Sequence, residues 1–120
     1  PGLDAEPHHV DTIEWFASPG DVCRAFAGLH GMASEPGAEP LGAILSQQVA
    51  GIGLEPGDWP TVWYKGGSEP GVLTLGWLAT TDEDETFVVE AMVSDPDAAL
   101  AEDVITDLVT LAEDAFALLG

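Results

Sequence analysis

The first half of the chain carries apolar side chains at the spacing of helices. Ser18-Pro19-Gly20-Asp21 combines an N-cap serine, a proline at the first helical position and an acid three residues after the cap. Apolar positions then recur every three or four residues, as on one helix face: Val22, Phe26, Leu29 and Ala33. The pattern predicts a helix from Ser18 to about Ala33. A second, short helix is predicted from Pro40 to Val49, with three inward-facing side chains: Leu41, Ile44 and Leu45.

The second half changes to runs rich in β-branched and aromatic residues. Three such runs predict strands over Thr61–Lys65, Val72–Thr80 and Phe87–Ser94. The connections between them are short, and the second is the acidic turn 81–86. Short connections favour an antiparallel meander.

The chain ends in another helical pattern. Asp95-Pro96 repeats the helix-start chemistry of an acidic N-cap followed by proline. An apolar stripe about five turns long follows: Leu100, Val104, Leu108, Leu111, Ala115 and Leu119. Four further apolar residues broaden it: Ile105, Val109, Ala112 and Phe116. Because the opposite side of this segment is acidic, we expect a long helix that covers one face of the three strands.

These elements predict one α+β domain over residues 1–120. Its fold class is a three-stranded antiparallel meander covered by a long C-terminal helix and preceded by two helices. Residues 1–17 form a linker, 18–58 the helical part, and 59–120 the sheet with the C-terminal helix. His8 and His9 are adjacent and point to opposite sides of an extended chain, so we expect linker rather than a metal site.

The charge of the chain restricts its partners. Twenty-two acidic side chains oppose only Arg24 and Lys65, giving a formal net charge of −20. Such a surface repels phosphates and anionic lipid heads, which argues against nucleic acid and membrane partners. No apolar run approaches the roughly 18–20 residues that span a bilayer. Two interpretations of the charge stay open: solubility, including life at high salt or low pH, and a specific basic partner.

Other candidate chemistry is weak. Cys23 and His30 lie seven residues apart on one helix face, which is more typical of core packing than of a catalytic dyad. The acidic run 82–85 lacks the spacing of a calcium loop, and no phosphate-binding glycine loop is present. We therefore expect no metal and no cofactor. Four tryptophans are either core residues or walls of a ligand cleft: Trp15, Trp59, Trp63 and Trp77.

The most specific stretch is Lys65-Gly66-Gly67-Ser68. It contains the only lysine of the chain, followed directly by two glycines and a serine. Glycines let the backbone come close to a bound molecule, and the lysine offers a fixed positive charge in an otherwise acidic protein. A glycine-rich turn with an exposed lysine is the plainer interpretation.

The order of elements around this stretch resembles the C-terminal half of the serine β-lactamases and penicillin-binding D,D-peptidases, and of class A β-lactamases in particular. In that family the third sheet strand carries a Lys-Thr/Ser-Gly motif, and the last helix packs on the sheet. Lys65-Gly66-Gly67 stands at the motif. Ser18-Pro19-Gly20-Asp21-Val22 is similar to the start of the helix that follows the family's Ω-loop. The resemblance covers roughly residues 12–120.

The resemblance implies a role for each residue of the motif. Lys65 would bind the carboxylate of a small-molecule or peptide substrate and bias proton transfers. The backbone N–H of Ser68 matches one arm of the oxyanion hole. Gly66, Gly67 and Glu69 would line the bound substrate, which lies alongside the strand. The reaction would be acyl transfer or amide hydrolysis through an acyl-enzyme, outside the cytoplasm as is usual for the family.

The chain also departs from the family. Gly66 replaces the motif hydroxyl, which Ser68 would have to supply instead. Because Lys65 is the only lysine, no Ser-x-x-Lys nucleophile motif exists, and without asparagine there is no Ser-x-Asn. We therefore expect this chain alone to be inactive.

The nucleophile would then lie outside these 120 residues. We expect them to be the C-terminal portion of a longer domain, with an N-terminal segment or a partner chain pairing along strand 87–94. The alternative is a non-catalytic binding or interaction module that retains the fold.

Overall fold

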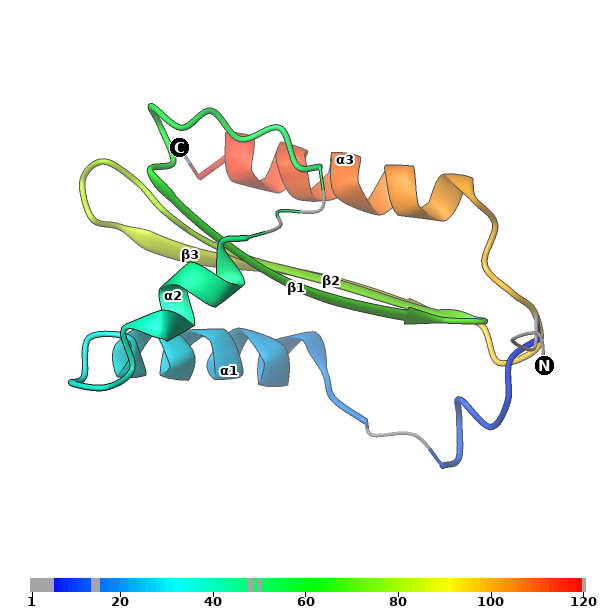
Figure 1. Ribbon diagram of the computed structural model, residues 1–120. Coiled ribbons are helices and arrows are strands. Elements are labelled where there is room, and N and C mark those ends of the chain that lie inside the picture. The colour runs from blue at the N-terminus through cyan, green and yellow to red at the C-terminus, as the bar shows by residue number, and fades with distance from the viewer. Residues whose placement is uncertain (1–5, 14–15, 48, 50, 120) are drawn as a thin grey trace.

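The computed structural model describes residues 6–13, 16–47, 49 and 51–119. Within these ranges it contains three helices and one three-stranded sheet: α1 (Pro19–Met32), α2 (Pro40–Leu45), β1 (Thr61–Glu69), β2 (Val72–Thr80), β3 (Thr86–Ser94) and α3 (Asp103–Ala117). The sheet lies between α1 on one face and α3 on the other (Figure 1). The predicted α+β class, with an antiparallel meander and a C-terminal helix, is confirmed.

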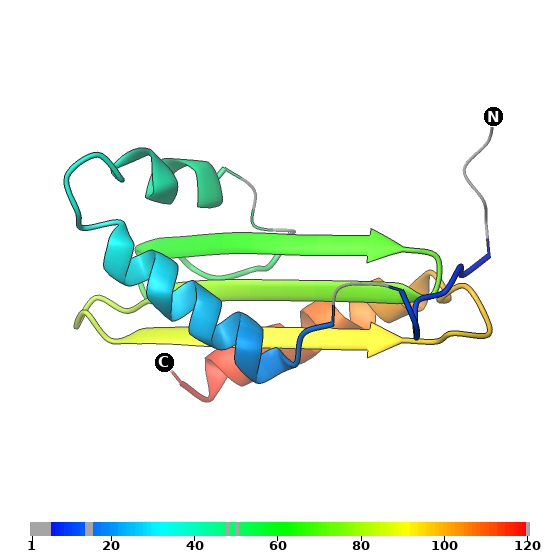
Figure 2. The same ribbon diagram turned by 90° about the horizontal axis from the view of Figure 1, so that it is seen from below.

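Helix α1 begins where its local sequence predicts. The Asp21 N–H donates to the Ser18 hydroxyl at 3.2 Å, and the Ser18 N–H donates to the Asp21 carboxylate at 2.9 Å. This reciprocal capping box satisfies two backbone donors at the helix start. The apolar face of the helix then packs on the sheet, with Phe26 only 3% exposed among Trp63 and Leu78. Figure 2 shows α1 crossing the sheet diagonally on this face.

Helix α2 is shorter than predicted and ends at Leu45 rather than at Val49. Leu45 packs on the core under α1, but Ile44 is 60% exposed, so the prediction that it faces inward is wrong. A helix of six residues presents little more than one turn to the sheet, and one face cannot bury every apolar side chain.

The sheet is a meander with the strand order β1-β2-β3. Strand β1 continues to Glu69, four residues beyond its predicted end, because Gly66 and Gly67 pair with Leu75 and Thr74 across the hairpin. The two strands are joined by Pro70-Gly71, and Gly71 adopts φ +81°, a conformation that favours glycine. Cross-strand pairing therefore overrides the low strand propensity of the two glycines.

Helix α3 begins at Asp103, later than the predicted start at Asp95. The carboxylate of Asp95 does accept hydrogen bonds from the backbone of Asp97 and Ala98, at 2.9 and 3.1 Å. However, the N–H of Asp95 donates to the Gly71 carbonyl at 2.7 Å, which ties this residue to the β1–β2 turn. The chain therefore follows the end of the sheet before the helix starts.

The buried face of α3 differs from the predicted stripe. Leu111 and Leu119 are 60% and 40% exposed, and Ile105 is 52% exposed. The most deeply buried side chains are two of the residues predicted to broaden the stripe, Ala112 and Phe116, at 1% and 0% exposure. Spacing by four residues places Ala112 and the large Phe116 ring over the sheet, so Leu111 falls on the helix flank, and Leu119 lies beyond the end of the helix.

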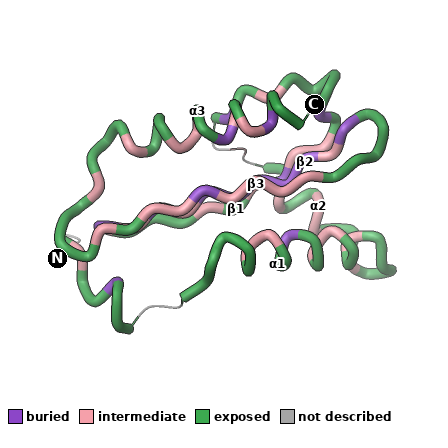
Figure 3. Tube along the Cα trace, turned by 180° about the vertical axis from the view of Figure 1, so that it is seen from behind, coloured by how far each residue is buried: buried purple, intermediate pink, exposed green. Residues whose placement is uncertain are grey.

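Two apolar cores result, one on each face of the sheet (Figure 3). Under α3, the Trp59 and Phe116 rings meet edge to face at 5.1 Å between centroids, and the Trp77 indole N–H donates to the Val49 carbonyl at 3.0 Å. Trp63 is buried under α1. These three tryptophans are core residues, whereas Trp15 lies outside the described residues.

Candidate functional site

Hydrogen bonds just beyond the ends of β2 fix the direction of its backbone groups. The Gly71 carbonyl accepts from the Asp95 N–H at 2.7 Å, and the Thr81 N–H donates to the Glu85 carbonyl at 2.8 Å. Both bonds point to the β3 side. In antiparallel strands the N–H and C=O of one residue point to the same side and alternate along the strand. Odd-numbered residues of β2 therefore bond to β3, and even-numbered residues bond to β1.

The same alternation exposes backbone groups at the outer edge of β1, which has no second neighbouring strand among the described residues. The partners of even-numbered β2 residues are odd-numbered, such as Lys65 opposite Gly76. Gly66 and Ser68 therefore direct their N–H and C=O groups away from the sheet. The Lys65 ammonium donates to the Gly66 carbonyl, so it lies at this edge. The Ser68 N–H points the same way, about 7 Å further along the strand.

A hollow lies beside the ammonium, between α2 and β1. Its volume is about 320 Å³, which is on the scale of a small ligand. It is lined by Ile44, Leu45, Gln47, Tyr64, Lys65 and Gly66. The helix supplies an apolar wall, and Lys65 supplies the positive charge. This combination suits a ligand with an apolar body and a carboxylate.

The absence of a side chain at Gly66 makes room for the ring of Tyr64. A Cβ atom at this position would lie 1.9 Å from the Tyr64 hydroxyl and 3.0 Å from the Thr74 carbonyl. The tyrosine ring therefore occupies the space that a threonine or serine side chain would need. A serine or threonine at position 66 would therefore displace the Tyr64 ring.

The five predicted site residues divide between the two faces of the sheet, because side chains alternate along β1. Gly66 and Ser68 face the α3 side, where Ser68 lines a separate hollow of about 230 Å³ with Leu100 and Ile105. Lys65, Gly67 and Glu69 face the α1 side. The Ser68 side chain is therefore not beside Lys65, and only its backbone N–H shares an edge with the ammonium.

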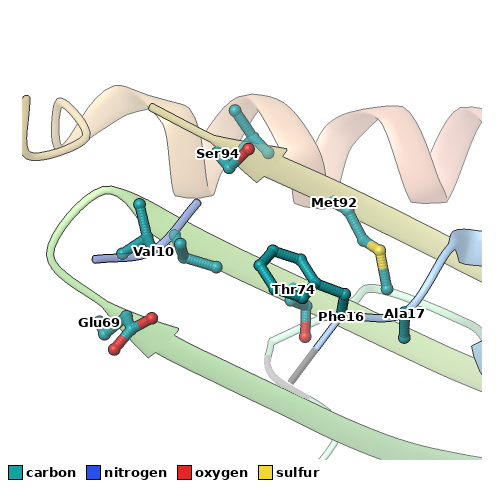
Figure 4. Close-up of a pocket in the computed structure, with 9 residues that line it drawn as sticks. Val10, Phe16, Ala17, Glu69, Thr74, Met92 and Ser94 are labelled. Atoms are coloured by element: carbon teal, nitrogen blue, oxygen red, sulfur yellow. The ribbon is translucent and has the colours of Figure 1, made fainter. Parts of the chain in front are cut away.

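Glu69 contributes to another hollow, at the end of the sheet that α1 leaves uncovered. This hollow has a volume of about 290 Å³, and Val10 and Phe16 from the N-terminal segment close it from outside. Thr74 and Met92 form its floor on β2 and β3 (Figure 4). A side chain at Gly67 would meet nothing within 4 Å, so the α1 side of the strand is open between Lys65 and Glu69.

Sequence reasoning missed Glu90, which lies in the same cross-strand row as Lys65. Gly76 pairs with Lys65 on one side and with Glu90 on the other. Both carboxylate oxygens of Glu90 are shielded from solvent and have no hydrogen-bond partner among the described residues. Burial raises the pKa of this carboxyl to about 7. An acid inside the apolar run of residues 87–93 was the visible signal, but its partners depend on the strand register.

The remaining candidates show packing roles. The His30 imidazole meets the Trp63 indole edge to face at 5.4 Å, and burial raises the pKa of the Cys23 thiol, which disfavours a reactive thiolate. Among the residues that the structure describes, no group of three or more side chains is placed to hold a metal ion. No helix in those same ranges is long and apolar enough to cross a bilayer.

No family model matches the chain, and no curated protein is similar enough to count as a relative. The interpretation of the site therefore depends on its residues and their geometry.

Proposed function

We propose that this chain supplies the carboxylate-binding wall of a β-lactamase-like acyl-transfer site, as the C-terminal part of a serine hydrolase. The observation that carries the proposal is the shared edge of β1, where the outward N–H of Ser68 follows the Lys65 ammonium about 7 Å further along the strand. A cation that binds the substrate carboxylate and a backbone donor for the oxyanion are two of the groups that an acylating site uses beside its nucleophile and general base.

The substrate would be a small molecule or peptide with a carboxylate, lying along β1 as an additional strand. Its carboxylate would bind Lys65, and its backbone-like amide would pair with the outward groups of Gly66 and Ser68. The open α1 side at Gly67 would leave room for substituents, with Glu69 at the far end of this path. β-Lactams and cell-wall peptides meet this description, and small esters that carry a carboxylate meet the part that concerns Lys65.

The nucleophilic serine would come from another segment or a partner chain. We propose that this segment or chain docks along β3 and extends past the sheet to place the serine beside the substrate at the outer edge of β1. The even-numbered residues of β3 direct their N–H groups outward, because the odd-numbered ones bond to β2. A groove of about 360 Å³ follows this edge, lined by Pro19 of α1, residues of β3, and Leu108, Leu111 and Ala115 of α3. An unpaired edge beside exposed apolar side chains favours strand addition.

In the completed site, the serine oxygen would attack the substrate carbonyl and form a covalent acyl-enzyme, which water then hydrolyses. The Ser68 N–H would hold the oxyanion of each tetrahedral intermediate. Losing one such donor typically slows a reaction by about 10²–10³-fold. Members of the resembling family usually act outside the cytoplasm, and we propose the same location here.

The test combines this chain with a segment that carries a Ser-x-x-Lys helix and measures acylation by a labelled penicillin. We expect labelling only in the mixture, and its loss when Lys65→Ala replaces the wild-type chain. Arg24→Ala is the matched control, because it removes the only other cation, which pairs with Asp21 on the exposed side of α1. Absence of labelling with every segment tested would refute the enzymatic proposal.

A second candidate is a non-catalytic module that binds carboxylates at the same edge. The glycine at position 66 favours it, since the motif hydroxyl is absent and its space is filled by Tyr64. The two proposals differ in one measurement. The module binds a penicillin or a peptide carboxylate reversibly at Lys65, and it forms no covalent adduct in any mixture.

A further inference from the structure

A row of three residues crosses the sheet on the α1 side: Lys65 on β1, Gly76 on β2 and Glu90 on β3. Directly paired residues of antiparallel strands place their side chains on the same face. The row therefore brings the only lysine of the chain and a shielded acid onto one face, with a residue that has no side chain between them.

The carboxylate of Glu90 lies over Gly76 rather than beside its own strand. A Cβ atom at position 76 would be 2.2 Å from Glu90 Oε2 and 2.7 Å from Phe26 Cε2. The carboxylate thus extends toward β1 beneath the Phe26 ring. Neither oxygen has a hydrogen-bond partner among the described residues, although a buried carboxylate is normally paired or hydrogen-bonded.

The distance that remains between the two groups is short. Because the carboxylate already lies over β2, the Lys65 ammonium has to cross only one strand interval, about 5 Å. The four-carbon stem of lysine spans that distance. On the Gly67 side of Lys65 the space is open, since a Cβ there would meet nothing within 4 Å.

We propose that Glu90 is a positioning residue for Lys65. Its carboxylate is a second acceptor for the ammonium, which lies either at the outer edge of β1 or across Gly76 against Glu90. In the first position Lys65 is bonded to the Gly66 carbonyl and available to a ligand; in the second it is withdrawn from that edge. The inference concerns the chain without ligand and does not depend on any acyl-transfer activity.

Ionisation of Glu90 decides between the two positions. A protonated Glu90 offers the ammonium little attraction, whereas the carboxylate attracts it at short range in a water-poor setting. The titratable groups that face Glu90 from the α1 side are Cys23 on α1 and Lys65 on β1, whereas Tyr64 on β1 interacts with it electrostatically from the α3 face. Of these only Lys65 carries a positive charge, so it is the natural counter-ion.

The single lysine makes the test specific to one site. The chain is labelled with ¹³C,¹⁵N-lysine, and the side-chain resonances of Lys65 are followed by NMR from pH 4 to 9. We expect an inflection below about pH 7 in the wild type, because the nearby ammonium favours the carboxylate, and none in Glu90→Gln, which keeps the shape of the side chain. Glu83→Gln removes the same charge from the exposed β2–β3 turn, and it should retain the inflection.

The reciprocal measurement follows the Glu90 carboxyl carbon, identified by its absence from Glu90→Gln. Removing the ammonium in Lys65→Gln should raise the midpoint of this titration by about one pH unit, as expected for loss of a close opposite charge. Arg24→Gln removes the other cation and should leave the midpoint unchanged. Two outcomes would overturn the proposal. The Lys65 resonances would still show the inflection in Glu90→Gln, or the titration midpoint of Glu90 would be unchanged in Lys65→Gln.

Discussion

At the scale of single residues, the contacts of Tyr64 set what position 66 can hold. The tyrosine hydroxyl lies where a Cβ of residue 66 would be, at 1.9 Å. By contrast, position 67 on the opposite face has no neighbour within 4 Å. Two adjacent glycines therefore differ in function: the first accommodates an aromatic side chain, and the second keeps one side of the strand open.

This contrast predicts different costs for the same substitution. Gly66→Ser should lower the free energy of unfolding by about 1–3 kcal/mol, because the tyrosine has to leave its position. Gly67→Ser should change it by less than about 0.5 kcal/mol. Urea unfolding measures both. In a Tyr64→Leu background the cost of Gly66→Ser should shrink, and equal costs in both backgrounds would show that the contact is unimportant.

The shielded Glu90 predicts a pH dependence of stability. Its pKa in the folded chain is about 7, above the ordinary value of 4.5. As pH rises from about 4.5 to 7, the unfolded chain releases this proton first, so the folded state loses stability across that window. Glu90→Gln does not titrate. The melting temperature of Glu90→Gln relative to that of the wild type should therefore be higher at pH 8 than at pH 4.

The comparison with Glu83→Gln isolates this effect from the general charge of the chain. That variant removes one exposed carboxylate, so the difference between its melting temperature and that of the wild type should stay nearly constant over the same pH range. A constant difference between wild type and Glu90→Gln at pH 4 and pH 8 would contradict the role assigned to burial.

At the scale of elements, the sequence predicts the boundaries that local interactions determine, and it misses those that depend on residues distant in the chain. The start of α1 was predictable because its capping box uses only Ser18 and Asp21. The end of β1 and the start of α3 were not, since they depend on cross-strand pairing and on the bond from Asp95 to Gly71. The site divides in the same way: Lys65 is visible in the sequence, whereas the position of Glu90 beside it requires the register of three strands.

The local origin of α1 can be tested at its cap. Ser18→Ala removes the acceptor for the Asp21 N–H and should lower the free energy of unfolding by about 1 kcal/mol. Ser34→Ala, at an exposed position just beyond the same helix, should have little effect. Urea titrations of the two variants provide the comparison, and equal midpoints would mean that the capping box contributes nothing.

At the scale of the whole molecule, charge acts across the full width of the fold. The net charge of −20 is carried by a body whose principal extents are 44 × 32 × 27 Å. Charges of one sign repel through solvent over about 30 Å at 0.01 M salt, and over only about 3 Å at 1 M. At low salt, therefore, most acidic side chains repel one another across the molecule.

Added salt should for this reason stabilise the protein. We expect the melting temperature to rise between 0.01 and 0.5 M NaCl, with most of the increase below about 0.15 M, where the screening length falls from 30 to about 8 Å. Circular dichroism measures the change. A melting temperature that is independent of salt would mean that the acidic side chains are too far apart to matter.

The hairpin connectivity of the sheet has a consequence for the order of folding. Each strand pairs with its neighbour in the chain, so closing the sheet costs little loop entropy and does not wait for distant segments. Hairpins of this kind form in about 1–10 μs. The sheet can therefore assemble first and present both of its outer edges as a ready template, and a segment supplied later, on the same chain or another, would have only to join it.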